Sequence, residues 1–282
     1  MSVQTIAVIG AGIMGSGIAQ VAAAAGYTTH LHDVTPAVLA KALGGIQKNM
    51  AQGVELGKTS EGEMKAALAR LTLDDDLERA AAPADLVIEA ISENVEWKTQ
   101  LFGRLDKACR PEAVLASNTS ALSLTEMAAV ITRPQRFIGM HFFNPVHKMK
   151  LVEIVRALET DPATVDVVRA VAERMGKETV VIQEAPGFIT SRINALIGNE
   201  AFYMLEDGIA SARDIDKALK LGLNHPMGPF EMIDLVGLDT RLGVLRYLHQ
   251  SLGEKYRPCP LLVKYVKAGR LGRKVGKGVY EY

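Results

Sequence analysis

Short apolar runs alternate with longer stretches of helical periodicity along the first two thirds of the chain. Residues 6–9, 84–91 and 113–117 form three such runs, which are rich in β-branched and aliphatic residues. This composition is typical of strands that are buried on both faces of a parallel sheet. The alternation predicts an α/β fold with a Rossmann-like, doubly wound sheet.

The pattern changes after the tripeptide Ala185–Pro186–Gly187, beyond which the periodicity is wholly helical. Proline and glycine interrupt regular structure, so we expect a domain boundary here, between residues 1–184 and residues 185–282. The helical part has more apolar positions than it needs to cover its own core. This excess predicts a homodimer, with a monomer that packs these helices onto the first domain as the alternative.

Composition narrows the possible partners. The 282 residues carry a formal net charge of zero and no basic block, which argues against binding to nucleic acid or to an anionic membrane. No apolar run approaches the roughly 18–20 residues that span a bilayer. The two cysteines, Cys109 and Cys259, lack metal-ligand spacing. We therefore expect reduced thiols, no metal site and a cytoplasmic location.

The first apolar run leads directly into the turn GAGIMG, in which Gly10, Gly12 and Gly15 have GxGxxG spacing around Ile13 and Met14. In such turns the first glycine permits the tight bend, the second lets backbone approach a pyrophosphate and the third lets helix and strand pack closely. Unpaired N–H groups at the start of the following helix favour phosphate binding. The strand–turn–helix context predicts a dinucleotide site formed by this turn.

Asp33 ends the next apolar stretch, 23 residues beyond Gly10. An acidic residue about 20 residues past the first glycine binds the adenosine ribose in these sites, and its charge repels a 2′-phosphate. The spacing therefore favours NAD over NADP. The alternative is a solvated aspartate at the end of a strand.

The stretch RFIGMHFFNPVHKMKLVEIV contains an apolar run that ends in His141, a turn with Asn144 and Pro145, and a second apolar run around Glu153. A carboxylate is costly to bury unless it is paired. Two strands joined by a turn can place His141 beside Glu153, which is the arrangement of a general base and its orienting group. A core histidine near an unrelated surface glutamate is the alternative.

Two further groups of polar residues are candidates for ligand contacts. Residues 36–70 form two polar helices, longer than a minimal crossover, whose Lys48 and Lys58 could bind a phosphate-bearing substrate or could simply be solvated. Polar residues also follow the run 113–117, and ligands bind beyond the carboxyl ends of strands in doubly wound folds. These residues are Ser117, Asn118, Thr119 and Ser120.

With GAGIMG, VIEAISEN, SNTSAL, HFFNPVHKMKLVEIV and PGFITSRI in family order, the chain resembles the 3-hydroxyacyl-CoA dehydrogenases over essentially its whole length, and most closely their short bacterial 3-hydroxybutyryl-CoA form. The resemblance implies NAD-dependent interconversion of an L-3-hydroxyacyl-CoA and a 3-ketoacyl-CoA by a homodimer in lipid metabolism. It also implies that residues 1–184 bind NAD and that residues 185–282 serve substrate binding and dimerisation.

The same resemblance implies residue roles. His141 is the catalytic base and Glu153 its orienter, while Ser120 and Asn144 bind the reacting oxygen and the thioester carbonyl near the cofactor. The expected cofactor contacts in addition to the glycine turn are Asp33, Glu93, Lys98 and Lys274. Ser191 stands where many relatives have asparagine, and it is expected to contact the substrate through a shorter side chain.

Two other functions are compatible with the residues. A histidine–glutamate pair with NAD does not itself specify CoA, so a dehydrogenase of a non-CoA hydroxy acid or sugar acid is one alternative. The other is a non-catalytic NAD-binding protein. A binding protein needs no base, so the set His141, Glu153, Ser120 and Asn144 argues against the second alternative.

Overall fold

The computed structural model describes residues 2–282 and divides the chain into two compact units. The first unit ends at Glu184, and the second spans Ala185–Tyr282. Within the described part of the chain, no helix combines the length and apolar character that crossing a membrane requires.

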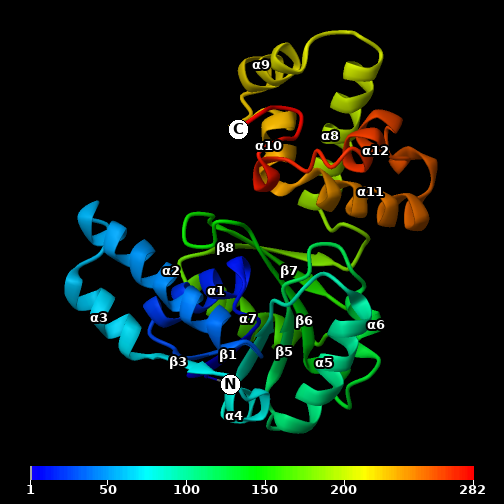
Figure 1. The fold of residues 1–282 in the computed structure, drawn as a ribbon. Helices are drawn as coiled ribbons and strands as arrows, with labels where there is room; N and C mark the ends of the chain where they lie inside the picture. The colour runs from blue at the N-terminus through cyan, green and yellow to red at the C-terminus, as the bar shows by residue number, and fades with distance from the viewer. Residues whose placement is uncertain (1) are drawn as a thin grey trace. The chain divides into compact units, whose positions relative to one another are not determined.

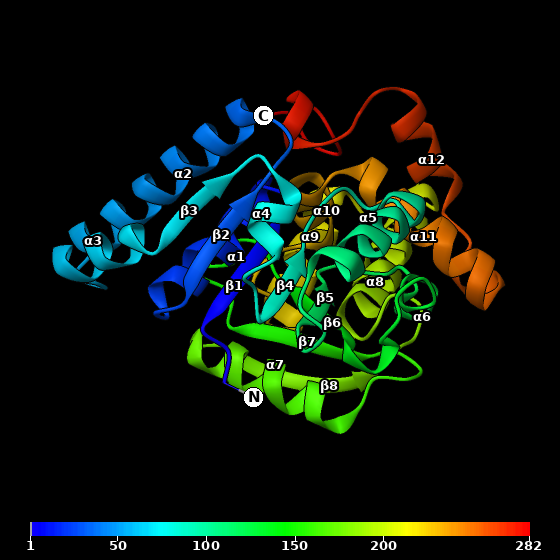
Figure 2. The same cartoon turned by 90° about the horizontal axis from the view of Figure 1, so that it is seen from below.

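The first unit is built on one eight-stranded sheet with the order β3-β2-β1-β4-β5-β6-β7-β8 (Figure 2). Its strands are β1 (Thr5–Ile9), β2 (Thr28–His32), β3 (Leu71–Asp74), β4 (Leu86–Glu89), β5 (Val114–Ser117), β6 (Phe137–Phe142), β7 (Leu151–Arg156) and β8 (Glu178–Gln183). Neighbouring strands are parallel except β6 and β7. The strand order reverses between β1 and β4, which is where doubly wound folds bind their ligands.

Helices cover both faces of this sheet, with α2 and α3 on one side and α5 and α6 on the other (Figure 1). The helices of the first unit are α1 (Ile13–Ala24), α2 (Pro36–Glu55), α3 (Glu61–Ala69), α4 (Leu77–Ala81), α5 (Val95–Ala108), α6 (Leu124–Ala128), the 3₁₀ turn η1 (Pro134–Arg136) and α7 (Pro162–Arg174). The core between the sheet and α1, α2 and α7 is aliphatic, with Ile18, Ile46 and Val168 almost completely buried. The expected fold class is confirmed.

Strands alternate their side chains between the two faces, which sorts the polar residues of the sheet. Ile138, Met140 and Phe142 of β6 join the core under α1, α2 and α7. His141, on the same strand, therefore points to the opposite face, which α5 and α6 cover. Glu153 lies directly across from His141 in the antiparallel β6–β7 pair, so the two side chains share that face.

The second unit is helical. Its elements are α8 (Thr190–Glu206), α9 (Ala212–Gly222), α10 (Pro229–Val236), α11 (Leu238–Leu252), the 3₁₀ turn η2 (Glu254–Tyr256), α12 (Pro260–Lys267) and the 3₁₀ turn η3 (Arg273–Val275). Aromatic and aliphatic side chains from most of these helices form its core, among them Phe202, Phe230 and Leu245.

The glycine-rich end of the chain is anchored to the helices of the second unit. Asp234 of α10 is 1% exposed, and its carboxylate accepts hydrogen bonds from the N–H groups of Val279 and Tyr280 at 2.8 and 2.9 Å. The Tyr280 hydroxyl donates to Asp216 at 2.7 Å. Val275 is half exposed, whereas Val279 and Tyr280 pack partly buried against the helical core, so hydrogen bonds and this packing together hold the chain end.

The elements that were not anticipated from the sequence include β3, α4 and α6. All three are only four or five residues long. Elements of this length show too few periods of an apolar pattern to be recognised. β3 completes the edge of the sheet beside β2, and α6 covers the part of β6 that precedes His141.

Asp85, which precedes β4, fastens the start of β1. Its Oδ2 accepts hydrogen bonds from the N–H groups of Gln4 and Thr5 at 2.8 and 2.9 Å, and its Oδ1 accepts one from Arg110 at 2.6 Å. Burial raises the pKa of the Asp85 carboxyl, but these hydrogen bonds and the Arg110 charge outweigh burial, so the pKa lies below its ordinary value.

We expect Asp85→Asn to lower the free energy of unfolding by about 1–3 kcal/mol at pH 7, because the amide leaves a buried donor unpaired. A folded-state pKa below the unfolded value of about 3.9 stabilises the protein above that value. This contribution is lost as the pH falls through the folded-state pKa. Urea unfolding of parent and variant should therefore show a gap that narrows below about pH 4. A gap that stays constant into that range would contradict this account.

Candidate active site

The glycine turn has the geometry that a dinucleotide requires. Gly10 has a φ of 102°, and a Cβ on Gly15 would lie 1.7 Å from the Gly10 carbonyl oxygen, so neither position accepts a side chain without distortion. A Cβ on Gly12 would meet nothing within 4 Å. The start of α1 has neither a side-chain cap nor an acidic residue in its first turn. Open space beside uncapped N–H groups fits a pyrophosphate.

Asp33 lies against this turn. Its Oδ2 accepts a hydrogen bond from the Ala11 N–H at 3.0 Å, and its Oδ1 accepts one from the Thr35 N–H at 3.0 Å. The carboxylate is therefore fixed beside Gly10 and Gly12 and is only partly buried. This position agrees with the expected ribose contact, although the contact itself remains a prediction.

His141 and Glu153 form the pair that the sequence predicts. Their side chains are 7% and 0% exposed, and His141 Nδ1 lies 2.7 Å from Glu153 Oε2. A carboxylate oxygen at this position accepts a hydrogen bond from Nδ1, and the tautomer that donates through Nδ1 has Nε2 as its basic nitrogen. The ring of Phe143 lies 4.4 Å from that of His141, centre to centre. This arrangement suits an oriented general base.

The polar residues after β4 and β5 are joined to one another. Glu93 Oε1 accepts hydrogen bonds from Thr119 Oγ1 at 2.6 Å, from the Ser120 N–H at 2.9 Å and from Ser120 Oγ at 3.3 Å. Asn118 Oδ1 accepts a hydrogen bond from the Phe142 N–H at 2.9 Å. The loop that carries Ser120 is thus tied to the end of β6, one residue beyond His141.

Lys98 is not at the surface. Its side chain is 1% exposed and its Nζ lies 2.5 Å from Glu89 Oε1 and 3.4 Å from Glu93 Oε2. Its charge is therefore met by two carboxylates, of which only that of Glu93 belongs to an exposed side chain (41%). Direct contact of Lys98 or Glu93 with the cofactor remains a prediction.

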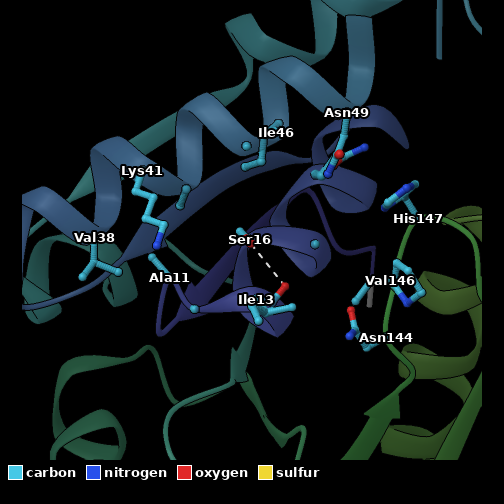
Figure 3. A pocket seen from close by; sticks show the side chains of 16 residues that line it. Ala11, Ile13, Ser16, Val38, Lys41, Ile46, Asn49, Asn144, Val146 and His147 are labelled. Carbon is cyan, nitrogen blue, oxygen red and sulfur yellow. Dashed lines mark hydrogen bonds between the residues drawn. The ribbon is translucent and has the colours of Figure 1, made fainter. Parts of the chain in front are cut away.

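A pocket of about 340 Å³ lies between α1, α2 and the turn that joins β6 to β7 (Figure 3). Gly12 and Ile13 line it at the glycine turn, and Asn144 and His147 line it from the β6–β7 turn. Lys41 extends from α2 toward Ala11. The pocket thus connects one expected cofactor contact with one expected substrate contact.

His147, which lines the pocket from the β6–β7 turn, is within range of several positive charges. Burial lowers the pKa of His147, and the charges of Lys148, Lys177 and Lys58 lower it further. Lys58 is therefore within electrostatic range of His147, although it is not among the residues that line the pocket. Lys48 is exposed on α2 and is not among the lining residues, so its contact with substrate remains a prediction.

Two expected residues belong to the second unit. Ser191 lies in the first turn of α8 and is partly buried. Lys274 Nζ lies 2.7 Å from both carboxylate oxygens of Asp239, so it is held at the start of α11. Their contacts with substrate and nicotinamide remain predictions.

Reasoning from sequence did not identify Glu89, Lys41 or Asn49. Glu89 carried a usable signal, because it stands in the apolar run LVIE as Glu153 stands in LVEIV. Lys41 and Asn49 carried none, since their place in the pocket depends on how α2 packs against α1.

Comparisons with known proteins agree with this geometry. Residues 5–185 match the model of the 3-hydroxyacyl-CoA dehydrogenase NAD binding domain, and residues 187–282 match that of the C-terminal domain of the same family. A protein of Bacillus subtilis (strain 168) named "Probable 3-hydroxybutyryl-CoA dehydrogenase" is 50% identical over 100% of this chain and 98% of its own length. A 3-hydroxybutyryl-CoA dehydrogenase of Bradyrhizobium diazoefficiens is 45% identical over 99% of this chain and 96% of its own.

Among solved structures, the (S)-3-hydroxybutyryl-CoA dehydrogenase PaaH1 from Ralstonia eutropha superimposes with a TM-score of 0.95 at 40% identity, covering 100% of this chain and 99% of that one. These matches confirm the family expected from the sequence motifs and confirm NAD as the cofactor. With its glycine turn and its histidine–glutamate pair in place, the chain belongs to the 3-hydroxyacyl-CoA dehydrogenase family.

Proposed function

We propose that this protein interconverts L-3-hydroxybutyryl-CoA and acetoacetyl-CoA with NAD. The observation that carries the proposal is the buried contact of 2.7 Å between His141 Nδ1 and Glu153 Oε2. A protein that only bound NAD would not need an oriented base. The short acyl chain is supported by the names of the full-length relatives.

His141 accepts and returns the proton that the reaction transfers. Its Nε2 takes the proton from the C3 hydroxyl as the substrate is oxidised, and returns it when the ketone is reduced. Glu153 holds the ring in the required tautomer and stabilises the imidazolium that forms. NAD bound at the glycine turn would supply the hydride chemistry at C3.

Ser120 and Asn144 orient the substrate. Ser120 Oγ, now 3.3 Å from Glu93 Oε1, turns its proton toward the C3 oxygen, where charge changes during the reaction. Asn144, on the pocket wall beside the glycine turn, donates to the thioester carbonyl. Ser191 adds a hydroxyl from the second unit.

The pocket beside α2 accommodates part of the CoA group. CoA carries several phosphates, and Lys41, Lys58 and Lys148 supply positive charge at or near the pocket. Lys48 lies further out on α2 and contributes to steering rather than to a fixed contact.

The second unit serves substrate binding and dimerisation. Large aliphatic side chains are exposed across it, which is unusual for a surface that stays in water. They are Ile189, Ile193, Ile209, Leu221, Leu223, Leu235 and Val236. Analytical ultracentrifugation that finds only monomers would contradict the dimer.

A cytoplasmic location is supported by the free, buried thiols of Cys109 and Cys259.

Purified protein should oxidise NADH with acetoacetyl-CoA, and less efficiently with long 3-ketoacyl-CoAs. Free acetoacetate should be a very poor substrate, because it lacks the group that fills the α2 pocket. Absorbance at the NADH wavelength measures all three rates. Equal or better turnover of free keto acids would favour the non-CoA dehydrogenase. Tight NAD binding without any turnover would favour the non-catalytic protein.

NAD should be preferred to NADP by on the order of 10²–10³-fold in kcat/KM, since a 2′-phosphate would lie next to the Asp33 carboxylate. Asp33→Asn keeps the size of the side chain and removes its charge, so the preference should shrink. Steady-state kinetics with both cofactors decide this. An unchanged preference in the variant would show that Asp33 does not discriminate between NAD and NADP.

His141→Ala should retain NADH binding but lose about 10²–10⁴-fold in kcat. Glu153→Gln should also lose on the order of 10²-fold or more, because the amide cannot stabilise the imidazolium with a negative charge. Its melting temperature should stay close to the parent's, since size and burial are preserved. Parent-like kcat in Glu153→Gln would remove Glu153 from the mechanism, and a collapsed melting curve would assign it a structural role instead.

A further inference from the structure

A closed ring of polar contacts lies at the carboxyl ends of β4 and β5. Glu89 Oε2 accepts a hydrogen bond from Ser117 Oγ at 2.6 Å, and Ser117 Oγ accepts one from the Thr119 N–H at 3.2 Å. Thr119 Oγ1 donates to Glu93 at 2.6 Å. Lys98 then completes the ring between Glu93 and Glu89.

Most members of the ring are buried from solvent. Glu89, Lys98, Ser117 and Thr119 are each at most 1% exposed. Burying two charges is often no better than burying two apolar side chains of the same shape, so such pairs are weak stabilisers. Glu93 is the one member whose side chain is 41% exposed, and it faces the loop that carries Ser120. The series of buried charged residues therefore leads to Glu93, which contacts the loop of the candidate site.

We propose that Glu89 is a positioning residue for Ser120, acting through Lys98 and Glu93. This inference rests on the proposed function, in which Ser120 donates to the C3 oxygen of the substrate. Glu93 holds the Ser120 N–H at 2.9 Å, so the position of Glu93 sets the position of Ser120.

Glu89 determines which of the two carboxylates Lys98 approaches more closely. Lys98 Nζ is 2.5 Å from Glu89 but 3.4 Å from Glu93. The Glu93 carboxylate therefore remains available to accept hydrogen bonds from Thr119 and Ser120. Without the Glu89 charge, Lys98 moves toward Glu93, the nearest remaining carboxylate. Glu93 is then drawn away from Thr119 and Ser120, and the Ser120 hydroxyl loses its alignment with the substrate.

A double-mutant cycle on the full chain tests this, using NADH and acetoacetyl-CoA. Glu89→Gln keeps the shape of the side chain, and its single amide oxygen can still accept a hydrogen bond from either Ser117 or the Ile91 N–H, which bond to different oxygens of Glu89. We expect it to lower kcat about tenfold in the parent, and less than about twofold in a Ser120→Ala background. Equal losses in both backgrounds overturn the proposal, because Glu89 would then act independently of Ser120.

Glu184→Gln is the matched control. Glu184 accepts hydrogen bonds from Ser123 and Thr125 at the start of α6, close in sequence to Ser120 but outside the ring. Its effect on kcat should be the same with and without Ser120→Ala. A coupling to Ser120 as large as that of Glu89 would mean that the loop responds to any lost carboxylate, which contradicts a specific role of the ring.

If Glu89→Gln does not fold, Ser117→Ala tests the ring as a whole, because it removes the hydrogen bond to Glu89 and the one that Ser117 accepts from the Thr119 N–H. A loss of about threefold that disappears in the Ser120→Ala background supports the proposal, and an additive loss overturns it. NADH affinity, measured by fluorescence titration, should change little; a large change without coupling to Ser120 would place Glu89 on the cofactor side instead. Parent activity and the Ser120→Ala loss test the proposed function separately.

Discussion

The desolvation of buried carboxylates is the constraint on which both units depend. Glu89 and Glu153 are each 0% exposed within the sheet, where an ionised group is tolerated only if cations and hydrogen-bond donors meet it. Glu153 accordingly holds His141, and Glu89 holds Lys98. Asp234 fills the same role in the second unit, where it fixes backbone N–H groups near the chain end. The positions of the reactive groups thus follow from the need of buried carboxylates for cations and hydrogen-bond donors.

What could be predicted from the sequence was mostly local. The strands and helices around the glycine turn follow from apolar periodicity and from the spacing of Gly10, Gly12 and Gly15. The contact of His141 with Glu153 was predictable because a single turn joins their strands and because a carboxylate inside an apolar run needs a partner. The family motifs extended these local features to the whole chain.

What could not be predicted depends on packing between distant segments. Glu89 carries the same sequence signal as Glu153, but its partners come from α5 and β5, so they are identifiable only once the order of the sheet is known. The contact of Lys41 rather than Lys48 with the pocket depends on how α2 lies against α1. The short elements β3, α4 and α6 are held by their neighbours more than by their own propensities.

The pairing of Glu89 with Lys98 also restricts how the chain can change by mutation. Replacing Lys98 alone leaves the Glu89 carboxylate buried without a cation, which costs about 3–5 kcal/mol, a large part of a typical stability of about 5–15 kcal/mol. Replacing Glu89 alone leaves Lys98 only the more distant Glu93. Replacing both by apolar residues of similar size can be nearly neutral. A lineage that drifted away from this pair by single steps would therefore pass through poorly folded intermediates. The two positions are expected to be inherited together or lost together, which makes them one evolutionary unit.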